Sequence, residues 1–333
     1  MYNLLYKLQC IVNMRCIFIK FVCVLFIIAC GVYVQAQDIS PYNNNLSNAT
    51  LYNPSFTGIG PASATMSYSS RYLNFPGETK YFFFNAHTPF ANQRMGTGVN
   101  LHSRSTGIYN VLSLSTAYAY HFKMNEDMGI SLGVAAGNER ISLGNNVGFC
   151  DSPEPSYEII PLSHNPFIAL GASFRYKSIN VGISSFRQNI FEFITADVPN
   201  IARGRSFNAW FTMDYHVVEN VVFRPYLAYK YYNVPVPAKW EGGLYITLDQ
   251  RFVLGGAYKH EEQKAYKGGR FYTTLGVHIF KRYHLAYNFV KGGAPTTVLG
   301  ATAHEFTLHV ALGRKQKESD NGLSLAFQDP AIE

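Results

Sequence analysis

Apolar and polar residues alternate with a period of two along most of this chain, and this pattern constrains its fold more than any other feature. Such alternation places successive side chains on opposite faces of a β-strand. Fourteen segments show it, each about nine to thirteen residues long, which is the length that a tilted strand needs to cross a bilayer. The segments cover residues 62–73, 78–88, 95–104, 108–122, 128–141, 166–176, 179–188, 206–217, 221–232, 239–249, 251–260, 270–280, 283–291 and 303–313.

The segment 108–122 illustrates the two faces of such a strand. One face carries Leu112, Leu114 and Tyr118, and the other carries Ser113 and Ala117. A face of large apolar side chains next to a face of small or polar ones is typical of a strand between lipid and the lumen of a barrel.

The lengths of the connections give a second, independent pattern. Connections after even-numbered segments are short, as at 124–127, 177–178, 218–220, 249–250 and 281–282. Those after odd-numbered segments tend to be longer, as at 142–165, 189–205, 233–238, 261–269 and 292–302. The sequence therefore predicts an all-β fold: a transmembrane antiparallel β-barrel of about 14 strands, with short periplasmic turns and longer extracellular loops. A soluble β-sandwich or propeller would need strands of about five or six residues, and no blade-like repeat is visible.

The composition agrees with this fold and excludes other classes. Charged residues make up 15% of the chain and aromatic residues another 15%, while the mean hydropathy is −0.04. So many aromatic residues exclude a disordered chain. Beyond the N-terminus no apolar run reaches about 18 residues, which excludes a multi-span helical protein. The net charge of the full chain is +7, and it falls to +4 (25 − 21) without residues 1–36; this charge is too mild and too scattered to indicate a nucleic-acid partner.

Residues 1–36 are predicted to be a signal peptide. Arg15 and Lys20 flank an apolar stretch that runs to Val34, and cleavage is expected after Ala36. Two alternatives remain, a permanent transmembrane anchor and a lipobox that would place a lipid on Cys30.

Cleavage would remove four of the five cysteines. Only Cys150 would remain, so no disulfide could form within the mature chain. The stability of the protein would then depend on the sheet itself.

Three regions follow the predicted signal peptide. Residues 37–61 are polar and rich in asparagine, so they are expected to sit below the barrel or to fold into it as a plug. Residues 62–313 form the predicted barrel. Residues 314–333 form a charged tail, which is either a disordered end or a periplasmic docking segment.

No motif in the sequence indicates catalysis, a metal or a cofactor. CxxC, HExxH, GxSxG and P-loop patterns are absent. His304 and His309 would point to opposite faces of one strand, and Glu305 lies roughly 13 Å along the strand from His309. The chain is therefore predicted not to be an enzyme.

The strand parity also predicts which polar side chains face the lumen. This set of lumen residues is either a solvated, self-paired interior or a plug or constriction. Its members are His87, His121, Arg175, Asp214, His216, Arg224, His278 and His309, together with Lys230 and Glu305.

Several short motifs resemble, in order, those of the PorP/SprF family of type IX secretion and gliding-motility membrane proteins of Bacteroidetes. They are Asn53-Pro54 with Gly58, Ser70-Arg71-Tyr72, Ala117–Tyr120 before Glu126-Asp127, Ser131–Gly137, and His304-Glu305 before Leu308. The motif positions are Asn53, Pro54, Gly58, Arg71, His304 and Glu305. Thr57 and the pair Ser55-Phe56 depart from the smaller residues that are commoner in the family. These departures leave the choice of partner open.

The resemblance implies a non-enzymatic component of the cell outer membrane, in contact with its lipid. It would support secretion or surface anchoring of a cognate adhesin through the adhesin's C-terminal domain, beside the periplasmic ring and the translocon. Loops 142–165 and 189–205 would contact the adhesin, whereas the segment around Asn53-Pro54 and the tail would face periplasmic partners. The alternative function is an outer-membrane diffusion channel or small-hydrophobe transporter, although the inward aromatic residues Tyr81, Phe83, Trp210, Tyr226 and Tyr272 would help to fill a pore. A barrel-borne hydrolase is a more distant alternative.

Overall fold

A computed structural model describes residues 49–71, 78–106, 109–143, 163–189, 206–218, 220–232, 239–263, 266–280, 282–292 and 302–312. The predicted signal peptide and tail lie outside these residues. The strands are β1 (Ser63–Arg71), β2 (Thr79–Phe90), β3 (Met95–Thr106), β4 (Tyr109–Lys123), β5 (Met128–Leu143), β6 (Ser163–Tyr176), β7 (Ile179–Asn189), β8 (Ser206–Met213), β9 (Tyr215–Val218), β10 (Val221–Tyr232), β11 (Lys239–Leu248), β12 (Phe252–Gln263), β13 (Tyr266–Ile279), β14 (Tyr283–Gly292) and β15 (Thr302–Ala311).

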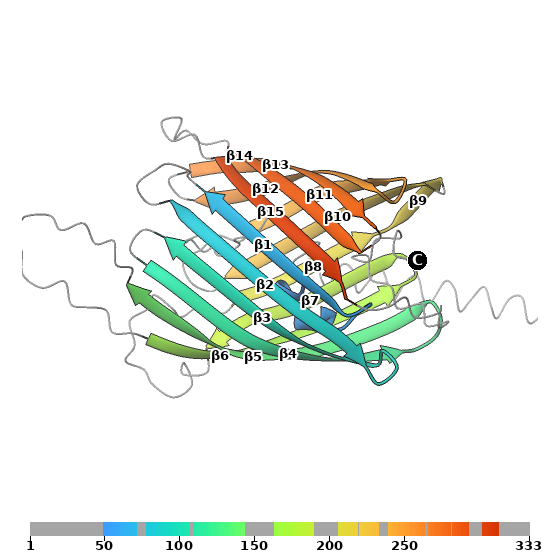
Figure 1. The fold of residues 1–333 in the computed structure, drawn as a ribbon, viewed down its shortest axis with the longest axis horizontal. Helices are drawn as coiled ribbons and strands as arrows, with labels where there is room; N and C mark the ends of the chain where they lie inside the picture. The colour runs from blue at the N-terminus through green and yellow to red at the C-terminus, as the bar shows by residue number, and fades with distance from the viewer. Residues whose placement is uncertain are drawn as a thin grey trace, which may run out of the picture. The chain divides into compact units, whose positions relative to one another are not determined.

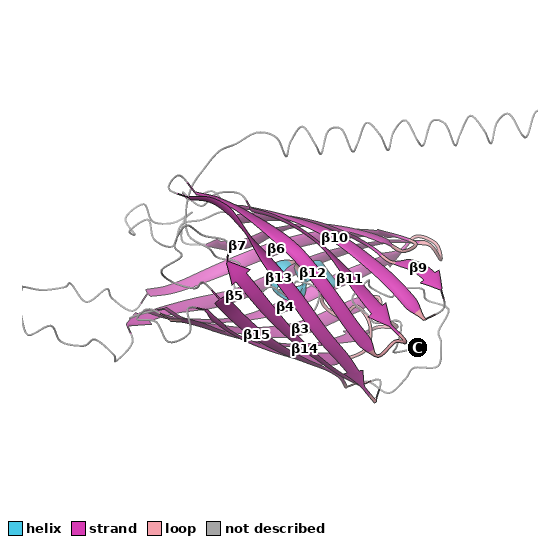
Figure 2. Cartoon of the chain, turned by 90° about the horizontal axis from the view of Figure 1, so that it is seen from above, coloured by secondary structure: helices cyan, strands magenta, loops and turns pink. Residues whose placement is uncertain are grey.

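The strands form a closed antiparallel barrel (Figures 1 and 2). Apart from β8 and β9, each strand pairs with its neighbour in the chain; β1 pairs with β15, and β10 pairs with both β8 and β11. β8 and β9 pair with β10 one after the other and together occupy one strand position in the barrel. The fifteen strands therefore fill fourteen strand positions. The predicted all-β barrel of about 14 strands is confirmed.

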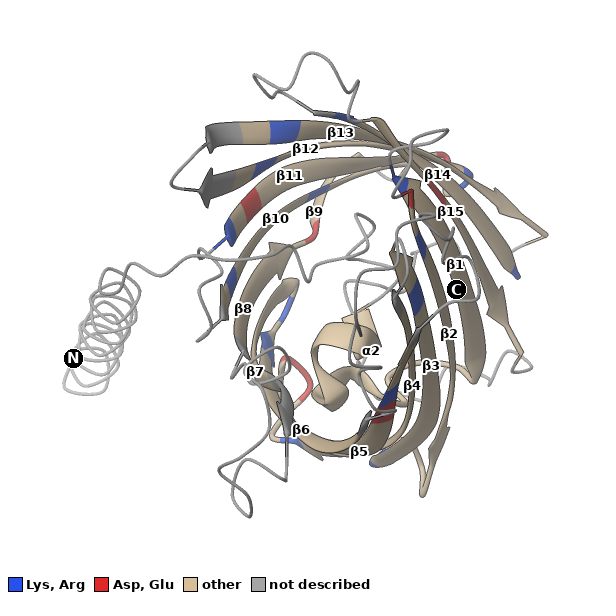
Figure 3. Cartoon of the chain, turned by 90° about the vertical axis from the view of Figure 1, so that its left-hand side faces the viewer, with Lys and Arg blue, Asp and Glu red and all other residues tan. Residues whose placement is uncertain are grey.

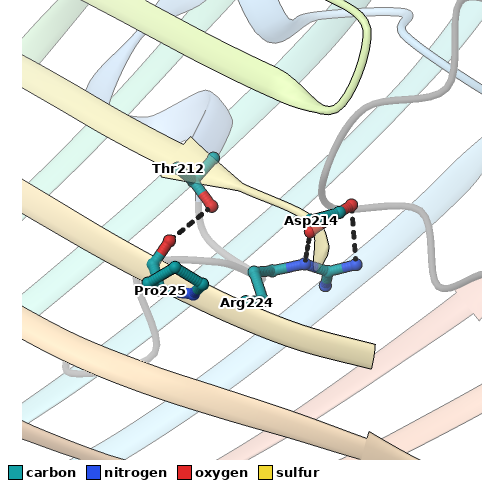
Figure 4. A network of polar contacts seen from close by, with 4 residues as sticks. All are labelled: Thr212, Asp214, Arg224 and Pro225. Carbon is teal, nitrogen blue, oxygen red and sulfur yellow. Dashed lines mark hydrogen bonds and ion pairs between the residues drawn. The ribbon is translucent and has the colours of Figure 1, made fainter. Parts of the chain in front are cut away.

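The break between β8 and β9, which the sequence did not predict, has a local cause. Tyr226 pairs with Thr212 and Phe223 with Tyr215, so Asp214 lies opposite Arg224 and next to Pro225. Proline has no backbone N–H to donate, and a hydrogen bond of the ladder is lost there. The Thr212 hydroxyl donates to the Pro225 carbonyl at 3.2 Å (Figure 4).

The two faces of the wall follow the predicted alternation. Leu114 on β4 and Phe306 on β15 are more than half exposed on the outer face. Ser113, Ala117 and Tyr272 are buried on the inner face. An apolar outer face and a polar or small inner face suit a wall that separates lipid from a lumen.

The two ends of the barrel differ in their connections. The short connections lie at one end, here called the turn end. At Asp249 and Gln250, φ is 48° and 53°, as a two-residue hairpin turn requires. The strands on either side of residues 144–162 and 190–205 have their other termini at the opposite end, here called the loop end, and these two connections are outside the described residues.

One predicted loop is wrong. Residues 261–269 were expected to form a long connection, but β12 continues to Gln263 and β13 begins at Tyr266. The strands extend through a polar stretch in which the period of two is hard to see. A strand that projects past the lipid needs no apolar face, which explains why the pattern fails there.

Two short helices precede the barrel. α2 spans Ala49–Tyr52 and the 3-10 helix η1 spans Pro54–Phe56. Within the described part of the chain, neither these nor any other helix has the length and apolar character required to span a membrane.

Candidate functional site

The segment Ala49–Gly60, here called the plug, lies inside the barrel. Figure 3 shows α2 within the ring of strands. Asn53 caps the 3-10 helix η1 of the plug. Its backbone is extended, and its side-chain oxygen accepts a hydrogen bond from the Ser55 N–H at 2.9 Å. Pro54 then fits the first position of the helix, where no N–H is needed. Every residue of the plug except Thr50 is buried.

The plug runs through the lumen between the turn-end part of β3 and the loop-end parts of β2 and β10. Its Gly58 contacts Gly96, the second residue of β3 at the turn end. The ring of Tyr52 lies 4.0 Å from the Lys230 ammonium, two residues from the loop-end terminus of β10. Tyr52 also belongs to a buried cluster with Tyr81, which lies near the loop end of β2.

A row of small residues forms the wall on which the plug rests. Gly96, Ala119, Gly133 and Gly171 are direct partners across β3, β4, β5 and β6. We call these four residues the small-residue row. A Cβ atom on Gly96 or Gly133 would overlap main-chain atoms of the plug, so this wall accommodates a polypeptide backbone at close range.

The row continues into polar residues that bind the next part of the plug. Gly171 pairs with Ser184 on β7, and Ser184 pairs with Asn208 on β8. The Ser184 hydroxyl donates to the Tyr52 carbonyl at 2.6 Å, and the Asn208 amide donates to the same oxygen at 3.4 Å. The plug therefore follows one lateral row across six strands.

Asn53 makes the most specific contacts between plug and wall. Its side-chain N–H groups donate to the carbonyls of Ala172 and Ile183, each at 3.2 Å. These two residues are partners on β6 and β7, so one amide bridges two strands. Next to it, the Ser55 hydroxyl donates to the Ser173 hydroxyl at 3.0 Å.

Two histidines hold the turn-end part of the plug. His121 lies 3.1 Å from the Thr57 carbonyl through Nε2 and 2.8 Å from the Ser131 hydroxyl through Nδ1. His87 accepts a hydrogen bond from the Gly58 N–H at Nδ1, at 3.2 Å. An accepting Nδ1 carries no proton, so His87 is neutral in this arrangement. Gly58 has φ of +74°, which favours glycine.

Apart from Lys230, which contacts Tyr52, the other predicted lumen residues are not gathered around the plug. Asp214 and Arg224 form an ion pair at 2.6 Å near the turn end (Figure 4). His309 bonds Thr65 at 2.8 Å, and His278 stacks on His284. Arg175 is half-buried on the inner face of β6.

His216 shares its strand face with Asp214, but it lies on β9, where all four side chains are exposed, so it is not part of a buried cluster of lumen residues. In the described ranges no group of three or more His, Cys, Asp or Glu residues could hold a metal ion.

Tyrosine side chains cover the wall opposite the plug. The hydroxyls of Tyr226 and Tyr272 both reach the carboxylate of Glu241. The Tyr226 ring lies against Gly243, and the Tyr245 ring lies against Gly255. On this wall the space beside the glycines is filled by aromatic rings. On the wall from β3 to β6 the space beside the glycines is filled by the plug. The five inward aromatic residues named from the sequence are all buried.

The six family-motif positions fall at several places. Asn53, Pro54 and Gly58 belong to the plug, and the expectation that Asn53-Pro54 faces periplasmic partners is wrong, because both are buried in the barrel. Arg71 ends β1 at the loop end, with its guanidinium 5.3 Å from the centre of the Tyr81 ring.

The two motif residues on β15 point to opposite faces. Glu305 is fully buried and accepts from Asn288 at 3.3 Å. His304 bonds the Tyr287 hydroxyl at 2.8 Å on the other face.

The comparisons with known proteins agree with this architecture. Residues 34–310 match the family model of the type IX secretion system membrane protein PorP/SprF. No curated protein matches the chain.

Solved structures that are similar to this chain include the following three. The Acinetobacter baumannii outer membrane protein Omp33 is 8% identical, with 77% of this chain and 100% of that chain covered and a TM-score of 0.47. A Pseudomonas aeruginosa FadL homologue is 10% identical, with 84% and 99% covered and a TM-score of 0.47. The TodX deltaS2S3 mutant, a monoaromatic hydrocarbon channel, is 10% identical, with 81% and 93% covered and a TM-score of 0.49. At this level of similarity, the strand pairing of the chain itself defines the fold.

Proposed function

We propose, because the chain belongs to the PorP/SprF family of type IX secretion system membrane proteins, that it is a non-enzymatic outer-membrane component of this secretion machinery. Its role is to support the secretion or surface anchoring of a cognate adhesin through the adhesin's C-terminal domain. The observation that carries this proposal is the family match over residues 34–310.

The filled lumen supports a role at the ends of the barrel. The plug covers the wall from β3 to β8, and the tyrosine cluster covers the opposite wall. A folded partner has no path through such an interior. The partner therefore binds at the loop end, where the long connections between β5 and β6 and between β7 and β8 leave the barrel.

The orientation follows from the connections. Short turns face the periplasm in outer-membrane barrels, and long loops face the outside. In this orientation the turn end meets the periplasmic ring and translocon components, the exposed apolar outer face meets lipid, and the loop end meets the adhesin.

Loop deletion tests this proposal. Residues 145–160, between β5 and β6, are replaced by a short Gly-Ser linker, and adhesin on the cell surface is measured with an antibody. We expect display to be lost while the barrel still assembles. The control shortens the connection 293–300 between β14 and β15 and leaves display intact. Normal display after the first deletion would contradict the proposed role of the loop.

The alternative function, a diffusion channel or small-hydrophobe transporter, requires an open path. The burial of Phe83, Tyr226 and Tyr272 together with the plug weighs against such a path. The conductance of the purified protein in planar bilayers separates the two functions.

A further inference from the structure

β9 extends past the strand next to it. The N–H of Asp214 donates to the Ser178 carbonyl at 3.0 Å, and this bond is the last one toward β7, which begins at Ile179. Tyr215–Val218 continue beyond it. At the equivalent place β13 continues only from His278 to Ile279 after its bond to Arg251. β9 therefore has an unusually long overhang.

The overhang has a free edge of backbone groups. In an antiparallel strand the N–H and C=O of one residue point to the same side, and the side alternates from one residue to the next. The backbone of His216 therefore faces the same way as that of Asp214, toward the space beyond Ser178. The other edge of β9 is taken by β10, and no described strand pairs with the free edge.

The side chains of the overhang are also exposed and partly apolar. Tyr215, Val217 and Val218 are each more than half exposed. Unpaired backbone cannot lie in lipid, because each unsatisfied group costs several kcal/mol there. An exposed edge of this kind in water takes up an additional extended strand, with backbone bonds that give affinity and alternate side chains that give specificity.

We propose that this edge binds the C-terminal segment of the same chain, with residues 323–327 added as a short strand beside β9. The last described residue, Leu312, lies at the turn end, where its N–H donates to the Ala62 carbonyl at 2.7 Å. Twenty-one residues follow it. Among them Leu323, Leu325 and Phe327 alternate with Ser324 and Ala326, which is a strand pattern.

The tail is long enough to reach β9. Going back from β15, β9 is six strands away around the wall. A barrel of fourteen strands spaced about 4.8 Å apart and tilted by about 40° is roughly 28 Å across. The ten residues 313–322, when extended, span roughly 33 Å. Residues 323–327 therefore reach β9 with no change in the barrel.

Cysteine cross-linking tests the position of the tail. Val217→Cys and Leu325→Cys are combined in a Cys150→Ser background and treated with a short bis-maleimide in intact outer membranes. We expect a cross-link within the monomer, identified by mass spectrometry of the linked peptides. The control pairs Leu325→Cys with Met124→Cys, an exposed residue at another turn of the same end. Equal linkage to both positions, linkage only between two copies, or no linkage would overturn the proposal.

Hydrogen exchange tests the backbone pairing. The His216 amide is followed in detergent-solubilised full-length protein, in a chain that ends at Gly313, and in full-length Leu325→Pro. We expect its exchange to be about fivefold faster or more in both variants, the factor that corresponds to one net hydrogen bond. Amides that bond within the β9–β10 pair serve as the internal control. Unchanged exchange of the His216 amide in both variants would overturn the proposal.

Discussion

The side-chain oxygen of Asn53 occupies the space that a Cβ atom on Gly171 would take. The contact joins the plug to the small-residue row and accounts for both residue types. Only glycine leaves this space open. Only a side-chain amide both accepts from the Ser55 N–H and donates to the carbonyls of Ala172 and Ile183.

Replacing Gly133 by valine is expected to destabilise the barrel and displace the plug. The new side chain would overlap the main chain of Pro54 and Ser55, so the plug would have to leave its place against Gly133. We expect a loss of about 1–3 kcal/mol in the free energy of unfolding, as for overpacked sites, measured by urea titration in detergent micelles. Gly256→Ala is the matched control, because its Cβ would meet only one atom, at 4.0 Å. Equal stability of Gly133→Val and Gly256→Ala would contradict the close contact between Gly133 and the main chain of the plug.

Asn53→Asp is expected to release the plug more completely than Asn53→Ala. An aspartate cannot donate to the carbonyls of Ala172 and Ile183 and places negative charge beside them. The alanine variant only loses these bonds, at about 1 kcal/mol each. Release is measured as maleimide labelling of Ser55→Cys, a position that is fully buried in the native protein. Labelling that is equally slow in both variants would argue against this role of Asn53.

The ion pair between Asp214 and Arg224 is expected to stabilise the barrel at the interruption between β8 and β9. Both side chains are mostly buried, with 18% and 8% exposed. Arg224→Gln or Asp214→Asn alone should lower the free energy of unfolding by about 2 kcal/mol, since a charged partner is left behind. The double variant should lose less than the sum of the two, and a double-mutant cycle measures the difference. Strict additivity would show that the pair contributes nothing.

The intact protein is expected to conduct poorly in planar bilayers. Gly133→Val, which displaces the plug, should increase the conductance, whereas Gly256→Ala should not. Large, stable channels from the native protein would favour the channel function.

Much of the wall could be predicted from the sequence, because lipid imposes a period of two on each strand. Leu114 and Phe306 point outward and Ser113 points inward, as the alternation requires. The pattern failed where lipid no longer acts on the strand. It missed the extension of β12 to Gln263 and the break at Asp214, which depends on Pro225 in a neighbouring strand.

The seat of the plug could not be predicted in the same way. Gly96, Gly133 and Gly171 lie far apart in the chain and become neighbours only when the register of four strands is known. Ser173, Ser184 and Asn208 gave no signal of their own for the same reason. The placement of His87 and His121 by parity was informative, but the parity could not show that the plug would bind them.

A disulfide that fixes the plug in the lumen tests most directly the central claim, which is that the protein handles its partner at the loop end while the lumen stays closed. The hydroxyls of Ser55 and Ser173 are 3.0 Å apart, so a Ser55→Cys/Ser173→Cys pair in a Cys150→Ser background should form a disulfide that fixes the plug in the lumen. Surface display of the adhesin is then measured with the disulfide formed and after mild reduction, with each single variant as a control. If the protein handles its partner at the loop end, display by the oxidised protein equals that of the reduced protein. Loss of display on oxidation and its return on reduction would contradict the account, because function would then require the lumen to open.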